Sequence, residues 1–247
     1  LWSRGLGDVY KRQSIYTAIT ETLVWLNKED EALNAARKAM NISHLTLPET
    51  HPDRALADYT LGDILFRKGQ FKEAEFLVNQ SLEAQTILYG ERNAVLASTL
   101  DALSLIQQAE GKINDAELNA RRALTITENA LGRNNINVAY FHTALADVLN
   151  KKNNYLEAKN HAQTAMTILE KNNATDHQYM ASAEYMLAQT LLATNQPKQA
   201  EQLLRKNIAR WKENSAPTWR VARSESLLGA VLIALNHNHE GEQLLHS

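Results

Sequence analysis

Hydrophobic residues recur at helical spacing in short stretches that glycine, proline or asparagine separates. From Pro52 onward the apolar positions include Leu61, Ile64 and Leu65, which lie three and four residues apart and fall on one face of a helix, and Leu56 is assigned to the same helix. Gly69 is expected to end that helix in a left-handed conformation. A second helix is predicted from Phe71 to Gly90. The pattern therefore predicts a helical hairpin.

The turn of this hairpin belongs to an internal repeat. Its sequence, GQFKEAE at 69–75, is followed at intervals of 42 residues by GKINDAE, NNYLEAK and NQPKQAE, preceded by NKEDEAL, and followed after a final interval of 41 by NHNHEGE. One small residue is kept in every copy: Ala32, Ala74, Ala116, Ala158, Ala200 and Gly241. A small side chain at a fixed period predicts a place where two helices approach closely, and the period predicts a solenoid.

The same pattern extends over most of the chain. We expect an all-α solenoid of about six helix-turn-helix units, at 14–51, 52–92, 93–134, 135–175, 176–216 and 217–247, the last one incomplete. In the first unit the second helix is predicted from about Asp30 to Met40. Pro197 is expected at the first position of a helix, where its missing N–H costs little. No stretch has the pattern of a strand.

A second small position lies 12 residues before each of these anchors, and a large apolar residue precedes it. The small residues are Thr20, Gly62, Ser104, Ala146, Ala188 and Gly229. The large-small pair and the downstream alanine resemble the tetratricopeptide repeat (TPR), and the 42-residue period resembles the kinesin-light-chain type. This resemblance implies an α-α superhelix in which helix A of each unit crosses helix B at the small residues. It also implies a non-catalytic protein-protein interaction scaffold that binds a peptide or protein partner in a concave groove.

The last repeat suggests an alternative. Residues 216–245 are similar to the closing repeat of the TPR region that follows the catalytic domain in many bacterial serine/threonine protein kinases. The chain contains no kinase motif, because a Gly-rich loop with its paired lysine, an HRD and a DFG are all missing. The alternative function is therefore the regulatory or docking TPR region of such a kinase.

The TPR resemblance also names the residues expected to line the groove, which lie three before and one after the small position of helix A. The partner-binding candidates are Tyr59, Asp63, Asp101, Thr143, Asp147, Tyr185 and Gln189. These positions lack the Lys/Asn clamp for a terminal carboxylate and the paired Asn of kinesin light chains. Our hypothesis is a basic peptide, held by the three aspartates through charge and by the two tyrosines through contact area. The competing interpretation is a solvated surface without a ligand.

Composition excludes several classes of function. The 26 basic and 28 acidic residues give a formal charge of -2, so no overall field favours nucleic acid or an anionic membrane. There is no cysteine, which excludes disulfides and thiolate sites and fits a reducing, cytoplasmic compartment. No apolar run approaches the roughly 18 residues that a membrane span needs. We therefore expect neither nucleic acid nor membrane as a partner of this chain.

The sequence offers little catalytic chemistry. Of the eight histidines, His237, His239 and His246 lie near one another, but apart from Glu240 and Glu242 nothing is placed to complete a tetrahedral metal site. No serine has the context of a nucleophile elbow, and the carboxylates fall on faces that are ordinarily hydrated. We expect no catalytic residue, no metal and no cofactor, and therefore no enzyme in this chain.

Both ends differ from the repeats. Residues 1–13 lack the helical pattern, and DVYKRQ at 8–13 resembles the translated transposase end used in sequencing libraries, so this leader is expected to be an artefact or else a disordered tail. The chain stops inside the second helix of the last unit. We therefore expect a fragment of a longer, bacterial protein of metagenomic origin. An apolar face that lacks its next helix predicts self-association.

Overall fold

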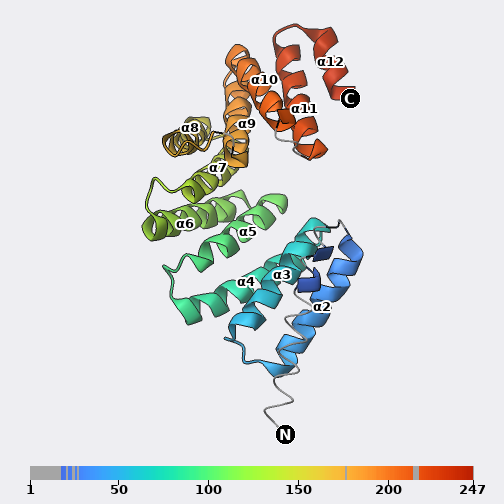
Figure 1. Cartoon of the computed structure of the whole chain (residues 1–247), viewed down its shortest axis with the longest axis vertical. Coiled ribbons are helices and arrows are strands. Elements are labelled where there is room, and N and C mark those ends of the chain that lie inside the picture. Colours follow the sequence, from blue (N-terminus) through green and yellow to red (C-terminus); the bar gives the residue numbers. More distant parts are fainter. Residues whose placement is uncertain are drawn as a thin grey trace. The chain divides into compact units, whose positions relative to one another are not determined.

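The computed structural model describes residues 18–246 apart from residues 21, 24, 25, 27, 176 and 214–216. The predicted leader at 1–13 and the predicted start of the first unit at Ser14 lie outside the described residues. Within those residues every regular element is a helix, which confirms the all-α class. Figure 1 shows these helices in chain order.

The helices alternate between the two arms of successive hairpins. The first arms, called A helices here, are α3 (Pro52–Arg67), α5 (Val95–Ala109), α7 (Ile136–Lys151), α9 (Gln178–Ala193) and α11 (Thr218–Ala234). The second arms, called B helices, are α2 (Glu29–Thr46), α4 (Phe71–Tyr89), α6 (Ile113–Leu131), α8 (Tyr155–Lys171), α10 (Pro197–Glu213) and α12 (Asn238–His246). Pro52 and Pro197 open their helices as the sequence predicts.

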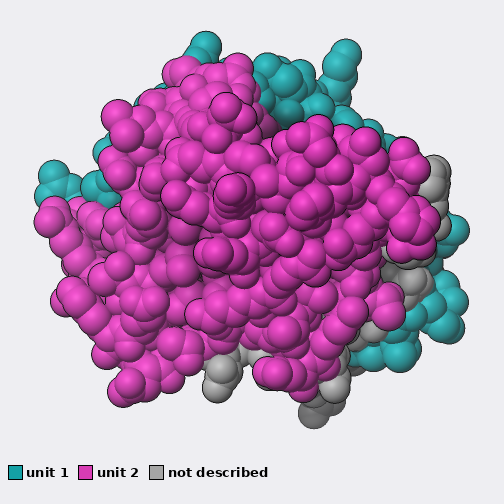
Figure 2. All heavy atoms as spheres, turned by 90° about the horizontal axis from the view of Figure 1, so that it is seen from above, with its two compact units in different colours: residues 1–126 teal, residues 127–247 magenta. Residues whose placement is uncertain are grey.

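The chain forms two compact units, residues 1–126 and 127–247, which Figure 2 colours separately. In the first unit α2 packs on α3, α3 on α4 and α4 on α5. In the second unit each helix from α7 to α12 packs on the next one along the chain, and α7 also contacts α9. Each unit has its own apolar core, one around Leu61, Leu65 and Val78 and the other around Leu187, Leu204 and Leu232. Packing between sequence neighbours is typical of a helical repeat fold.

The A and B helices of a hairpin cross at the small residues. A Cβ atom added to Gly62 would lie 2.5 Å from Val78 Cγ2 and 3.3 Å from the carbonyl oxygen of Ala74. One added to Gly229 would lie 2.9 Å from the carbonyl oxygen of Gly241. The repeated small positions are therefore the closest approach of the two helices, as predicted.

Left-handed residues terminate the A helices. Gly69 and Gly111 have φ values of +75° and +78°, and Asn153, Asn195 and Asn236 occupy the same repeat position with φ between 58° and 65°. Glycine adopts this conformation without a steric penalty, and asparagine tolerates it better than other residues with a side chain. The turn therefore keeps one geometry although its residue changes.

One detail of the sequence prediction was wrong. Helix α2 does not stop near Met40 but continues to Thr46, and Leu47 then turns to an extended conformation because it precedes Pro48. Leu56 belongs to α3 as predicted, but 45% of its surface is exposed. It lies five residues before Leu61, which places it about 140° away around the helix.

Buried polar contacts join the two helices of some hairpins. The hydroxyl of Ser81 on α4 donates to the carbonyl oxygen of Ala55 on α3 at 2.7 Å. Asn207 on α10 donates to the carbonyl oxygen of Ala181 on α9 at 2.6 Å. Both donors lie seven residues after the small residue of their B helix, and both are almost fully buried. Sequence reasoning did not identify these contacts.

The same polar layer reaches the next A helix. Thr99 on α5 donates to the side-chain oxygen of Gln85 on α4 at 2.8 Å, and Ser224 on α11 donates to that of Asn207 at 2.7 Å. A buried amide that loses such a partner costs about 1–3 kcal/mol. These contacts therefore fix how one hairpin sits on the next within each unit.

We predict that Gly62→Val destabilises the protein by about 2–4 kcal/mol, because the new side chain must displace Val78 or part the two helices. Chemical denaturation followed by circular dichroism measures the change. The control is Leu56→Val, because this variant introduces the same β-branched residue at an exposed position of the same helix. Equal stabilities of the two variants would contradict the proposed crossing.

Candidate partner-binding surface

The predicted binding residues all lie on A helices. Tyr59 and Asp63 are on α3 and Asp101 is on α5, and these three belong to the first unit. The second unit carries the other four: Thr143 and Asp147 on α7, and Tyr185 and Gln189 on α9. The candidates therefore form two sets, one in each compact unit.

The first set brings a tyrosine together with two carboxylates. Burial, and then the negative charges of Asp63 and Asp101, raise the pKa of Tyr59 to about 12. Its hydroxyl therefore stays protonated at neutral pH and can donate a hydrogen bond. Asp63 accepts from Arg67 Nε at 3.0 Å, and Asp101 is only 7% exposed. This face is acidic, but one of its charges already has a cationic partner.

The second set contains residues with different degrees of access. Thr143 is 8% exposed and donates its hydroxyl to the carbonyl oxygen of Ala139. Asp147 pairs with Lys151 one helical turn later, at 3.2 Å. The side-chain oxygen of Gln189 is buried and accepts no hydrogen bond from the described residues. Tyr185 is half-buried, and the guanidinium carbon of Arg223 lies 4.3 Å from its ring centroid.

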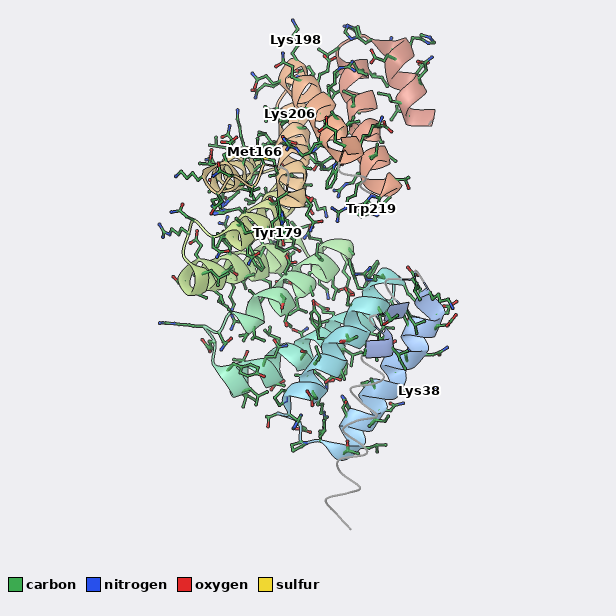
Figure 3. All side chains as sticks on the ribbon, in the orientation of Figure 1. Lys38, Met166, Tyr179, Lys198, Lys206 and Trp219 are labelled. Atoms are coloured by element: carbon green, nitrogen blue, oxygen red, sulfur yellow. The ribbon has the colours of Figure 1, made fainter. Side chains whose placement is uncertain are left out.

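Tyr185 also lines a pocket of about 110 Å³ in the second unit. The pocket lies between α9, the C-terminal end of α10 and the first turns of α11. Its lining consists of Ala181, Ser182, Tyr185, Met186, Trp211, Trp219, Arg220, Arg223 and Ser224. Figure 3 labels Tyr179 and Trp219, which mark the first turns of α9 and α11. The pocket therefore opens beside one of the predicted binding residues.

Arginine and aromatic side chains stack in this pocket. The guanidinium of Arg220 lies 4.9 Å from the ring centroid of Trp211 and 5.2 Å from that of Trp219. Arg220 also donates to the side-chain oxygen of Gln178 at 2.9 Å. Such stacking favours one orientation of each guanidinium.

Sequence reasoning missed the two arginines and the two tryptophans. The signal was the start of α11, which reads TWRVARS at 218–224, whereas the corresponding stretch of the preceding repeat, at 177–183, reads HQYMASA. Trp219 and Arg223 thus stand where that repeat has Gln178 and Ser182. A unit that departs from its neighbours on the A-helix face indicates a specialised surface.

A polar pocket of about 170 Å³ lies between α3, α4 and the loop that follows α2, and Asp58 is one of its lining residues. His44 Nε2 lies 2.5 Å from Asp58 Oδ1, and Asp58 is 4% exposed. Burial raises the pKa of Asp58, while the hydrogen bond to His44 opposes that rise. The pair joins the last turns of α2 to α3, so its role is to fix the helices.

The described part of the chain holds neither a metal-ligand cluster nor a membrane-spanning helix. It contains no group of three or more His, Cys, Asp or Glu side chains that could hold a metal ion. None of its helices is both long and apolar enough to cross a membrane.

Two histidines meet inside the hairpin of α7 and α8. Nδ1 of His142 and Nδ1 of His161 are 2.8 Å apart, so one nitrogen carries the shared hydrogen and the other accepts it. Burial, and then the charge of His161, lower the pKa of His142 to about 4. Glu128 and Glu157 face the outer nitrogens of the two rings at 3.7 Å. The pair is a structural contact that requires at least one neutral ring.

Comparison with protein families gives one match along most of the chain. The sequence profile of the MalT-like TPR region matches residues 17–247. No curated protein sequence matches the chain.

Solved structures share the fold at low identity. A Podosopora anserina putative kinesin light chain with nearly identical TPR-like repeats has a TM-score of 0.68 and 18% identity, over 85% of this chain and 97% of that chain. BtubC (BKLC) from P. vanneervenii has a TM-score of 0.66 and 15% identity, over 96% and 88%. The apo form of RapI has a TM-score of 0.62 and 13% identity, over 96% and 85%. The predicted resemblance to kinesin-light-chain repeats is confirmed at the level of fold.

We predict that acid destabilises the hairpin of α7 and α8 through His142. The folded protein binds a proton on His142 more weakly than the unfolded chain does, because histidine in the unfolded chain has a pKa of about 6.5. The contribution of neutral His142 to the free energy of unfolding is therefore present above pH 6.5 and is lost as the pH falls toward 4. Over this range the free energy of unfolding falls with a slope approaching about 1.4 kcal/mol per pH unit.

The free energy of unfolding, measured by urea denaturation between pH 4 and 8, tests this prediction. The His142→Leu variant should lose that part of the pH dependence, whereas His237→Leu, at an exposed position, should keep it. Identical pH profiles for the wild type and His142→Leu would show that the buried ring does not titrate as predicted.

Proposed function

The chain belongs to the MalT-like TPR family, and from this we propose that it is a non-catalytic scaffold that binds a peptide or protein along its A helices. The observation that supports this best is the pair of half-buried tyrosines, Tyr59 and Tyr185, each next to charged side chains. A partly buried aromatic ring with a polar neighbour is the common anchor of a protein interface.

Helix geometry limits how a partner can be recognised. Inside a helix the backbone N–H and C=O groups bond to one another, so they offer no edge for strand addition. Recognition must therefore come from side chains, and those at the predicted positions belong to helices anchored by the small-residue crossings. Such a rigid support reduces the entropy lost on binding.

The ligand chemistry that we propose for the first unit is an extended or helical peptide with a basic residue. Asp63 and Asp101 lie near Tyr59, where a lysine or arginine could contact the ring and the carboxylates together. The charge contribution is modest, because Arg67 already pairs with Asp63 and exposed ion pairs contribute about 0–1 kcal/mol. We therefore assign most of the affinity to the tyrosine contact. Asp147 is a weaker candidate, since Lys151 pairs with it.

Two finer possibilities stay predictions. One is that this scaffold is the docking region of a bacterial protein kinase, which rests on the closing repeat. The other is self-association through the last helices, where Ile233 and Leu245 are 40% and 45% exposed.

We predict that Tyr59→Ala or Tyr185→Ala weakens binding to peptides selected on a positional-scanning array by about tenfold or more, because truncating an interface anchor costs about 2 kcal/mol. Fluorescence anisotropy with the selected peptides gives the dissociation constants. The matched control is Tyr89→Ala, an exposed tyrosine on helix α4. Affinities unchanged in both A-helix variants would rule out this face.

The charge part of the proposal has its own test. An Asp63→Asn, Asp101→Asn, Asp147→Asn triple variant should bind selected basic peptides more weakly and with a shallower salt dependence. Circular dichroism first establishes that the variant folds, because Asp101 is buried. An unchanged affinity and salt slope would remove the preference for basic peptides while leaving the tyrosine contacts in place.

A further inference from the structure

We propose that the pocket between α9, α10 and α11 binds a carboxylate of an acidic peptide through Arg220 and Arg223, while Trp219 covers the apolar part of the same segment. This inference rests on the proposed function, because it assigns a ligand chemistry to one part of the A-helix surface. It differs from the basic-peptide proposal for the first unit in its charged residues and in the sign of their charge.

Arg223 provides a guanidinium that has no acceptor among the described residues. It stacks on Tyr185 at 4.3 Å, and no described residue accepts a hydrogen bond from it or forms an ion pair with it. Other arginines of this unit are already paired: Arg205 with Glu201 and Arg210 with Glu184. A guanidinium that lies over an aromatic ring, with N–H donors that no described residue takes up, matches the two oxygens of a carboxylate.

Arg220 adds a second charge that is held more firmly. Its guanidinium lies near both tryptophan rings, and one nitrogen donates to Gln178, so the side chain keeps its orientation without a ligand. Only part of its five-donor fork is used by that bond. Two oriented arginines at one opening attract an anion more strongly than freely moving side chains, because less conformational entropy is lost on binding.

None of the described residues that line the pocket is acidic, so none of them opposes this charge. The buried carboxylate nearby, Glu184, is held by Arg210 and Asn207 on the neighbouring helix. The hydroxyls of Ser182 and Ser224 also have partners, since they donate to Gln178 and Asn207. The two arginines therefore supply the hydrogen-bond donors that a ligand can use, and their positive charge selects an anion.

The size of the pocket favours a side chain over a free metabolite. Its volume of about 110 Å³ is well below the roughly 300–1,000 Å³ of typical small-molecule sites. Trp219 is 59% exposed at its rim, where it can cover an aliphatic or aromatic neighbour of the captured group. The arrangement fits one acidic residue of a peptide together with one apolar residue.

The experiment uses a positional-scanning peptide array, printed with free and with amidated C-termini and probed with the full chain. Selected peptides and their Glu→Gln forms are then titrated while tryptophan fluorescence is followed, because Trp211 and Trp219 line the pocket. The variants are Arg223→Gln, Arg223→Lys and, as a matched charge control, Arg92→Gln in an exposed loop of the other unit.

We expect acidic peptides to bind and the Arg223→Gln variant to lose about tenfold or more in affinity, with a shallower salt dependence. Arg223→Lys should recover only part of the loss, and Arg92→Gln should match the wild type. Binding that survives amidation assigns the carboxylate to a side chain, and binding that requires the free terminus assigns it to the chain end. Both results support the pocket.

Three results would overturn the inference. Acidic peptides could fail to bind, could bind equally to Arg223→Gln, or could depend equally on Arg92. If Tyr59-dependent binding of other peptides persists in these cases, the scaffold function stands and only the acidic pocket is removed. If no peptide on the array binds the wild type, both proposals fail.

Discussion

The close crossing of paired helices is the constraint on which the rest of the structure depends. At Gly62 and Gly229 there is no room for even one additional carbon atom before it meets a side chain or backbone of the facing helix. Because the crossing recurs at nearly equal intervals, each hairpin presents a similar apolar surface to the next one. A fixed interval in sequence thus becomes a fixed geometry, and the A-helix side chains inherit their positions from it.

Because the crossings are fixed, the repeats differ in chemistry mainly at a few positions of the A-helix face. Residues at the crossings must stay small, whereas those on the A-helix face are free to differ between repeats. The first unit places carboxylates beside Tyr59, and the second places guanidinium groups beside Tyr185. One scaffold therefore offers surfaces of opposite charge, although the formal charge of the whole chain is only -2. Local charge, not total charge, decides which partner each surface suits.

The sequence predicted the features that depend on periodicity and failed on those that depend on particular contacts. Small residues at a constant interval and Gly or Asn at each turn revealed the hairpins. The continuation of α2 beyond Met40 was missed because residues 41–46, NISHLT, are mostly of low helix propensity, and propensity alone does not mark the end of a helix. At the candidate site the tyrosines could be placed by register, but the stacking of Arg223 on Tyr185 joins residues 38 positions apart. Such a pairing follows only from the packing of α11 on α9.

The buried polar contacts between hairpins make the order of the repeats matter. Asn207 requires the hydroxyl that Ser224 brings, and Gln85 requires the one that Thr99 brings. The repeats that carry Phe141 or Ala183 at this position offer these amides no hydroxyl, and each such mismatch would cost as much as a lost hydrogen bond. The repeats are therefore alike in shape but not interchangeable, and their order along the chain is part of what stabilises the fold.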